Sequence, residues 1–350
     1  MSQGDNANSP IEKRAGDSSS AHSSDYNLSG DTKSIESSVT QYRIEHGRRY
    51  HGYKDGTYWQ PNDDRQNENL DIAHMKFFHA LGGKLFLAPI TPTTGRVLDI
   101  GTGTGIWAMD FADEFPNTHV IGTDLSPIQP ELVPPNCVFE IDDCQDEWTY
   151  PVEHFDFIHI RSLFGSIEDW PALYRQAYKH LKPGGYIEHV EISIDIRSDD
   201  GTVTPGSPLR KFTELFVEAG NVTGCTFCIF DTMGDMIAAT GFEKMEQKII
   251  YTPLGRWHPD RKLRELGKWA LLGFDIGLEG YAMATLTRHM GWTQPEVHVL
   301  LAQIRADVKN PKIHSYHEIK VVYAQKPFPP DHPSATTSTK TPPIDSTPPV

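Results

Sequence analysis

The residues best placed to do chemistry form a glycine-rich run, VLDIGTGTGIW, at positions 97–107. An apolar stretch containing Asp99 is followed by three glycines at alternate positions, Gly101, Gly103 and Gly105. Glycines let a backbone turn sharply and approach a ligand closely, while the helix that follows presents its N-terminus. A dinucleotide loop requires G-x-G-x-x-G, but this loop has isoleucine at the third glycine position, and the chain contains no Gly-Lys-Ser/Thr step of a P-loop. The G-x-G-x-G spacing therefore indicates another kind of ligand loop.

The pattern h-h-D-h-G-x-G-x-G resembles motif I of the class I S-adenosylmethionine-dependent methyltransferases. The resemblance implies that the glycine loop backs the methionine and ribose portion of S-adenosylmethionine. It also implies that Asp99 orients the loop near the cofactor's amino group. Asp124, which ends the next apolar run, matches the family's acid that accepts both ribose hydroxyls. A carboxylate suits this task because its two oxygens can take two charge-assisted bonds.

The adenine end of the cofactor is expected on the following segment. By the same resemblance, Asp143 reads the adenine amino group and the main-chain N–H of Cys144 reads the ring. Asp142 is adjacent, and a shift of one residue would exchange the two acids. Leu125 and Trp148 are candidates to sandwich the adenine.

Longer segments resemble the fungal LaeA-like methyltransferases over residues 42–326. The matching stretches are 50–74, 122–130, 169–191 and 313–327. The resemblance implies that the first of them folds over the cofactor pocket, with Tyr50, Tyr58 and Trp59 as lid residues. The alternative for these aromatics is ordinary packing. Some members of this family regulate secondary metabolism in a nuclear complex with velvet-type proteins, and others methylate O or N atoms of small metabolites.

Methylation of a hydroxyl also requires removal of its proton, and histidine suits this near neutral pH. The candidates at the ends of the fourth and fifth predicted strands are His159, Arg161, His189 and Glu191. His159 lies in an apolar strand, which also fits a core histidine. His189 and Glu191 share strand parity and point to the same face. Either could be the base, and either could serve packing.

Cysteines and the remaining histidines indicate no metal site. Cys225 and Cys228 form a C-x-x-C pair, but zinc would need a second pair, and Cys137 and Cys144 belong to the predicted adenine side. We expect reduced thiols and an intracellular, cytoplasmic protein, with the nucleus as the alternative location. Four histidines are expected on the polar surface: His46, His51, His314 and His317.

The elements that position these residues alternate between strand and helix. Strands are predicted at 96–100, 119–124, 137–141, 155–160, 186–192, 243–251 and 318–324. Amphipathic helices are predicted near 70–81 and 107–115, after Asp169 and before Gly241. This order predicts an α/β fold, the class I methyltransferase Rossmann-like doubly wound sheet, which binds ligands at the carboxyl ends of its strands.

Composition divides the 350 residues into a domain and two tails. Residues 1–40 and 327–350 are poor in apolar residues and are predicted to be disordered, which leaves a methyltransferase domain at 41–326. Within it, 254–311 is predicted to form a helical insertion before the last strand. Its large apolar residues could cover an acceptor, as a cap, or add to the core: Trp257, Trp269, Phe274 and Tyr281.

The net charge of the chain disfavours some classes of binding partner. The chain has 32 Lys and Arg against 47 Asp and Glu, a net charge of −15, which disfavours nucleic acid and anionic lipid. It contains no apolar run long enough to span a membrane. We expect a methyltransferase that acts on a small-molecule acceptor of secondary metabolism. The alternative is a LaeA-like regulator with a velvet-type protein partner.

Overall fold

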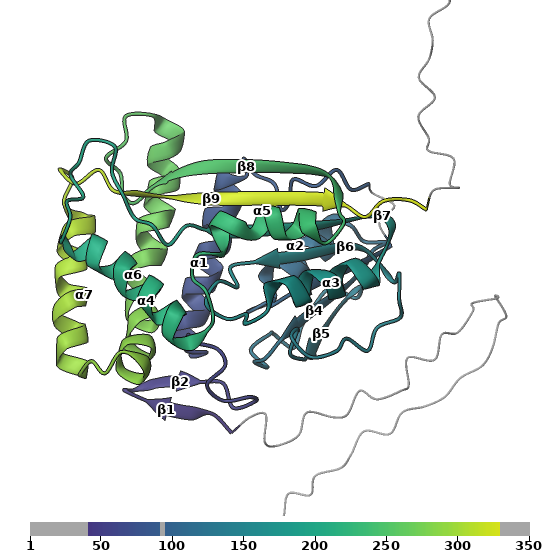
Figure 1. Cartoon of the computed structure of the whole chain (residues 1–350), viewed down its shortest axis with the longest axis horizontal. Coiled ribbons are helices and arrows are strands. Elements are labelled where there is room, and N and C mark those ends of the chain that lie inside the picture. The colour runs from purple at the N-terminus through teal and green to yellow at the C-terminus, as the bar shows by residue number, and fades with distance from the viewer. Residues whose placement is uncertain (1–40, 92–94, 330–350) are drawn as a thin grey trace, which may run out of the picture. The chain divides into compact units, whose positions relative to one another are not determined.

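The computed structural model describes residues 41–91 and 95–329. The predicted tail at 1–40 and all but the first three residues of the predicted tail at 327–350 lie outside the described residues. The elements (Figure 1) are β1 (Arg43–Glu45), β2 (Arg48–Tyr50), α1 (Asp64–Ala80), β3 (Arg96–Ile100), α2 (Ile106–Glu114), β4 (His119–Asp124), β5 (Cys137–Ile141), β6 (Phe155–Arg161), α3 (Trp170–His180), β7 (Leu181–Ile192), α4 (Pro208–Thr223), α5 (Ile229–Ala239), β8 (Glu243–Pro253), α6 (Arg261–His289), α7 (Gln294–Lys309) and β9 (Tyr316–Gln325).

Seven strands form one sheet in the order β5-β4-β3-β6-β7-β9-β8. The predicted α/β class is confirmed, and the first five strands of that order are parallel. β9 is antiparallel to both of its neighbours, which the alternation of strands and helices did not indicate. The reason lies in the insertion. Pro253 at the end of β8 pairs with Tyr316 at the start of β9, so the intervening helices return the chain to the end of the sheet that it left.

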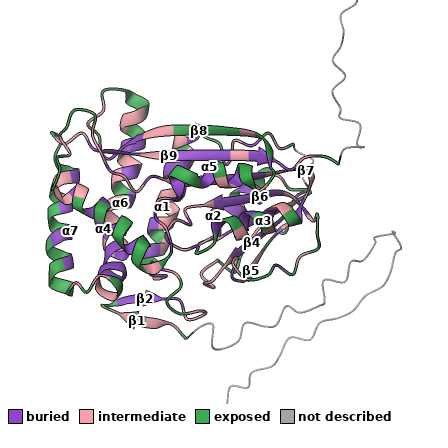
Figure 2. Ribbon diagram, viewed as in Figure 1, coloured by how far each residue is buried: buried purple, intermediate pink, exposed green. Residues whose placement is uncertain are grey.

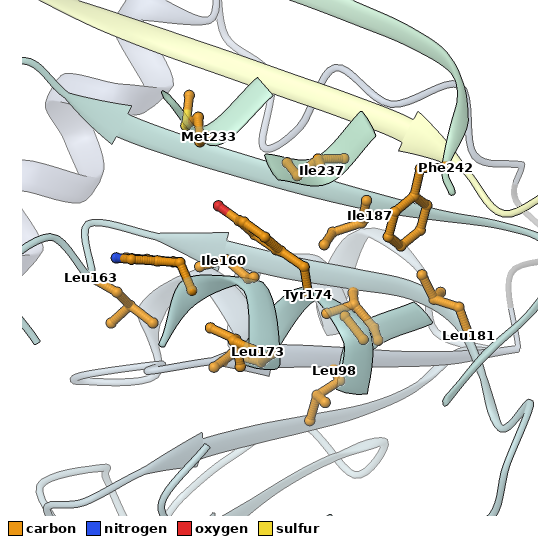
Figure 3. Close-up of a cluster of buried hydrophobic side chains, with 14 of the residues drawn as sticks. Leu98, Ile160, Leu163, Leu173, Tyr174, Leu181, Ile187, Met233, Ile237 and Phe242 are labelled. Atoms are coloured by element: carbon orange, nitrogen blue, oxygen red, sulfur yellow. The ribbon is translucent and has the colours of Figure 1, made fainter. Parts of the chain in front are cut away.

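Successive residues of β3 enter different layers, because side chains alternate along a strand. Leu98 joins a core built with α3 and α5, where Tyr174 and Ile237 also lie (Figure 3). Val97 packs with Trp107 of α2 on the opposite face. Burial on both faces explains why the central strands read as apolar runs. The edge strand β8 is exposed over much of its length (Figure 2).

Helices α4, α6 and α7 pack against one another at one end of the sheet, on the left in Figure 1. Asp260 caps α6 by accepting the backbone N–H groups of Lys262 and Leu263. α6 also packs along α1. Sequence patterns did not indicate α4 or the β1–β2 hairpin. No helix in the described part of the chain has the length and apolarity to cross a bilayer.

One buried carboxyl group makes the stability of this fold dependent on pH. Glu188 on β7 is fully buried, and its Oε2 accepts the backbone N–H groups of Leu87 and Ala88 at 2.8 and 2.6 Å. Burial raises its pKa from 4.5 to about 7. The folded state therefore holds this proton more tightly than the unfolded state does. The resulting stabilisation is lost as the pH rises from about 4.5 through about 7.

We expect Glu188→Gln to remove this pH dependence, because the amide does not titrate and its oxygen can still accept both N–H groups. Between about pH 5 and about pH 8, the difference in unfolding free energy between the variant and the wild type should move in the variant's favour by about 2–3 kcal/mol. Urea unfolding at both pH values measures it. Glu131→Gln, at an exposed position, corrects for the loss of one charge. An unchanged difference would mean that Glu188 does not titrate in this range.

Candidate functional site

A pocket lies at the carboxyl ends of β3, β4, β5 and β6. This edge of a parallel sheet is where α/β folds bind ligands. Seven of the eight predicted cofactor residues line it: Asp99, Gly101, Gly103, Asp124, Leu125, Asp143 and Cys144. Gly105 does not. It precedes α2 with a φ of 80°, and an added Cβ would lie 2.3 Å from the ring of Phe139, so this glycine lets α2 pack against β5.

Two carboxylates hold the glycine loop. Asp99 Oδ2 accepts the hydroxyl of Thr102 at 2.6 Å. Asp124 Oδ2 accepts the backbone N–H of Gly103 at 2.8 Å, and Gln129 Nε2 donates to the Gly103 carbonyl at 2.7 Å. Gly103 has a φ of 61°, in the left-handed region that favours glycine. The loop is therefore a fixed wall of the pocket.

Asp124 ends β4 and faces the pocket. Its Oδ1 accepts the backbone N–H of Ser126 at 2.9 Å. Burial raises its pKa to about 6 although the backbone N–H groups of Ser126, Gly103 and Leu125 stabilise the charged form. Each carboxylate oxygen keeps a further lone pair, so the group fits a ligand that offers two hydroxyls, such as a ribose.

Asp143 has an ionic partner that sequence patterns did not reveal. Lys54 Nζ lies 2.7 Å from Asp143 Oδ2 and 2.6 Å from Asp146 Oδ2. These partners are about ninety residues apart in the chain, and no local signal links them. Asp142 also lines the pocket, so the one-residue alternative stays open.

Of the two residues predicted to sandwich the adenine, one lines the pocket. Leu125 lines it, but Trp148 does not. Trp148 is buried in the core beside α3 and donates its indole N–H to the Cys144 carbonyl at 2.9 Å. Trp148 therefore supports the loop that carries Cys144 from the core side.

His159 is buried away from the pocket lining. Its Nδ1 lies 2.7 Å from Asp99 Oδ1, and its ring stacks on Trp107 at 3.7 Å between centroids. β3 and β6 pair in a register that places Asp99 and His159 side by side. Burial lowers the pKa of His159 to about 4. The side chain therefore fixes Asp99 and has no contact with pocket space.

His189 and Glu191 point to the same face as predicted, and both are fully buried. His189 bonds the Tyr174 hydroxyl at 2.8 Å and Glu191 Oε1 at 3.0 Å. Glu191 Oε1 also accepts the backbone N–H of Leu163 at 2.7 Å. In the described part of the chain, neither residue lines a cavity. Glu191 instead holds the segment after β6, which forms one wall of the pocket.

Arg161 brings a positive charge to the pocket. Its guanidinium lies over the Phe77 ring, 5.0 Å from the centroid, and 3.3 Å from His74 Nδ1. Within residues 41–91 and 95–329 it forms no ion pair with a carboxylate. His74 in turn bonds Asp110 at 3.0 Å. A cation in this position suits an anionic group of a ligand.

A second cavity adjoins the first. The two share four lining residues, Tyr58, Leu70, Ala73 and Ser162. Its other walls include six aromatic residues and three polar ones, Gln60, Asn69 and Ser193. The aromatic residues are Trp59, Phe164, Phe212, Phe216, Phe274 and Tyr281. Its ionisable residues are Lys76 and His317, apart from the tyrosine hydroxyls. A flat apolar molecule would fit such walls.

The insertion contributes to the second cavity through α6. Phe274 and Tyr281 line it, and Asn69 donates to the Tyr281 hydroxyl at 2.6 Å. Trp269 lies elsewhere and stacks on His79, while Trp257 donates to the Ser315 carbonyl at 3.0 Å.

Two of the three predicted lid residues line a cavity, and one does not. Tyr58 lines both cavities and Trp59 the second. Tyr50 is fully buried and lines neither cavity. The Arg288 guanidinium lies over its ring, 4.3 Å from the centroid.

Two histidines expected on the surface are buried. His51 is 1% exposed and bonds the Tyr53 carbonyl at 2.6 Å, and His317 is 6% exposed. The alternating pattern of β9, in which His317 lies, was the available signal for its burial. Cys225 and Cys228 are free thiols. In the described part of the chain, no group of three or more His, Cys, Asp or Glu residues could hold a metal ion.

The chain is similar to known proteins across this region. A model described as a methyltransferase domain matches residues 74–247, which include the glycine loop. Methyltransferase pytC of Aspergillus terreus is 39% identical over 84% of this chain and 91% of its own. The secondary metabolism regulator LAE1 of Cochliobolus heterostrophus is 38% identical over 81% of this chain and 94% of its own.

Two further matches are more distant. The protein-methionine methyltransferase laeA of Emericella nidulans is 34% identical over 84% of this chain and 79% of its own. A solved structure, phosphoethanolamine N-methyltransferase 2 of Haemonchus contortus, aligns with 78% of this chain and 54% of its own at 19% identity and a TM-score of 0.43. That likeness is too low to bear on the site.

Proposed function

The chain belongs to the LaeA-like family of class I S-adenosylmethionine-dependent methyltransferases, and from this premise we propose that it methylates an oxygen or nitrogen of a small secondary metabolite in a fungal biosynthetic pathway. One observation carries the proposal. The pocket formed by the glycine loop and Asp124 shares a wall with a cavity of aromatic residues. Two adjoining compartments of this kind suit a methyl donor and a flat acceptor.

Residues of the first pocket would hold the cofactor by the chemistry that they present. Asp124 would accept the ribose hydroxyls, Arg161 would pair with the methionine carboxylate, and Leu125 would contact the adenine. Asp143 or Asp142, with the N–H of Cys144, would read the edge of that ring. The bound cofactor supplies a methyl group on a sulfonium. The task left to this chain is to hold donor and acceptor in line, which contributes roughly 7–11 kcal/mol in well-oriented systems.

The three residues first considered as bases would act as positioning residues. His159 would keep Asp99 in place beneath the loop. His189 and Glu191 would hold the segment after β6 that separates the two cavities. Removal of the acceptor's proton then falls to a group inside the second cavity.

A regulatory role in a nuclear complex with a velvet-type partner is the second candidate, and the similarity to LAE1 favours it. The two candidates differ in what a deletion strain loses. A biosynthetic enzyme in the cytoplasm controls one methylated product, whereas a regulator controls many pathways together.

Two aromatic residues of α6, Phe274 and Trp269, give a matched test of the role of the second cavity. We expect Phe274→Ala to abolish formation of the methylated metabolite, because Phe274 lines the second cavity. Trp269→Ala removes a comparable aromatic side chain that does not line it, and should leave the product unchanged. A deletion strain complemented with each variant and fed isotope-labelled methionine measures the product. Calorimetry with S-adenosylhomocysteine should give equal affinities for both purified proteins.

Other outcomes would contradict the proposal in distinct ways. Loss of cofactor affinity in Phe274→Ala would show that this residue supports the first pocket instead. Full product formation with Phe274→Ala would remove the second cavity from the reaction. Simultaneous loss of many unrelated metabolites in the deletion strain would favour the regulatory role.

A further inference from the structure

Two ionisable side chains, those of Lys76 and His317, interrupt the apolar walls of the second cavity. Lys76 comes from α1 and His317 from β9, and they are 7% and 6% exposed. Buried lysines are rare unless they are paired, because burying a charge without a partner is costly. Their presence among apolar walls therefore calls for a ligand or a function.

Lys76 has no ion-pair partner among the residues that the structure describes. Among the described residues its ammonium forms no hydrogen bond or ion pair, and its close contact is the Phe77 ring at 4.7 Å. The charged groups that face it are Arg161 from the end of β6 and Glu191 from β7. His317 faces it from β9, and the α6 residues that line the cavity are uncharged. The pKa of Lys76 is lowered to about 7, mainly by burial and also by the charge of Arg161, while Glu191 opposes the shift.

His317 also has an unfilled bonding position. Its Nε2 is buried and has no hydrogen-bond partner among the described residues. Burial holds the pKa of this histidine well below its usual value, and the charge of Lys76 adds to that effect. The imidazole is therefore neutral near pH 7. A buried polar atom without a partner costs free energy that a bound ligand would recover.

We propose that the second cavity selects an acceptor with an acidic hydroxyl on a flat aromatic frame, a phenol or an enol, and that Lys76 removes its proton while His317 orients the oxygen. This assignment rests on the proposed function, because it names the acceptor class of the same site. A hydroxyl offers what both side chains lack, since it has a proton to donate and lone pairs that accept hydrogen bonds. The aromatic walls suit the rest of such a molecule.

The chemistry balances within the site. The hydroxyl proton passes to the Lys76 amine, which leaves a phenolate beside an ammonium. A lone pair of the phenolate oxygen then forms the bond to the methyl carbon, and the electron pair of the carbon–sulfur bond stays with sulfur. An amine that titrates near neutral pH is matched to this role. Lys76 and His317 are only 7% and 6% exposed, so water weakens the attraction between ammonium and phenolate less here than it would at the surface.

Umbelliferone tests this without methyl transfer, because its phenol and phenolate absorb at different wavelengths. Bound to the protein saturated with S-adenosylhomocysteine, the probe should ionise about 1–3 pH units below its value in water, as expected beside an opposite charge. Lys76→Met should abolish the shift while the probe still binds. His317→Phe should weaken binding and retain the shift. Lys84→Met, at an exposed site just beyond α1, should behave as wild type.

Several results would overturn the assignment. The first is an equal shift of the probe's pKa in the wild type and in Lys76→Met. The second is a probe that binds the wild type as a neutral phenol. The third is that umbelliferone, naphthol and a hydroxyanthraquinone all fail to bind. Equal affinity for the methyl ether of umbelliferone would show that the hydroxyl is not recognised. Lys76→Met replaces a buried charge with an apolar chain, so it should fold at least as well as the wild type. Failure to bind S-adenosylhomocysteine would instead contradict the proposed function.

Discussion

Gly103→Val is expected to abolish binding of S-adenosylmethionine. Gly103 has a φ of 61°, a region that a β-branched residue adopts only with strain. An added Cβ would lie 3.2 Å from Leu70 Cδ1, and the branched methyls would extend further along the wall of the pocket. The substitution would also disturb the bond from the Gly103 N–H to Asp124. Calorimetric titration with S-adenosylhomocysteine should show no measurable heat of binding.

A matched variant separates strain from occlusion. Gly82 has a φ of 72°, and nothing lies within 4 Å of the Cβ that it would gain. Gly82→Val should therefore lose stability for the same backbone reason and keep full cofactor affinity. If Gly103→Val folds and binds S-adenosylhomocysteine normally, the glycine loop is not part of the cofactor pocket.

Asp124→Ala is expected to weaken cofactor binding by roughly 10–150-fold, which corresponds to the loss of about 1.5–3 kcal/mol from hydrogen bonds to a charged acceptor. Burial raises the pKa of this carboxyl to about 6, so its charge is costly in the unliganded protein. The variant removes this cost but also loses the bonds to the N–H groups of Gly103 and Ser126, so we expect it to fold and to bind the cofactor more weakly than the wild type. Functional sites often hold groups that are strained in this sense.

The same carboxyl predicts a pH dependence of binding. Ribose hydroxyls donate to the ionised form, so binding favours that form. Affinity should fall as the pH drops through about 6 and Asp124 takes up a proton. Asp124→Asn should bind weakly and without this slope. Unchanged affinity in Asp124→Ala, measured by calorimetry at about pH 7.5, would show that this carboxylate does not contact the ribose.

Local patterns were sufficient for the parallel part of the fold and for the cofactor side. Glycine spacing and the apolar runs depend on neighbours within a few residues, so Asp99, Gly103 and Asp124 could be assigned to one sheet edge in advance. These features could therefore be predicted without information about contacts between distant segments. The alternation of strands and helices likewise predicted the α/β class, but it gave neither the strand order nor helix α4.

The acceptor side depended on contacts between distant segments. Lys76 and His317 lie 241 positions apart in the numbering, on α1 and β9, and they meet only because the α6–α7 insertion brings β9 back between β7 and β8. The bond between Lys54 and Asp143 is of the same kind.

Burial decided the roles of the histidines. His159 and His189 are near strand ends, which made them candidates for proton transfer, but strand parity does not say which layer covers a face. Trp107 and Tyr174 occupy those layers and enclose the two rings. The amino-acid sequence by itself determined where the glycine loop lies and placed Asp99, Gly103 and Asp124 at the edge of the sheet that carries the pocket. Only the tertiary structure decided which titratable groups reach a cavity, because that depends on side chains supplied by elements far away in the chain.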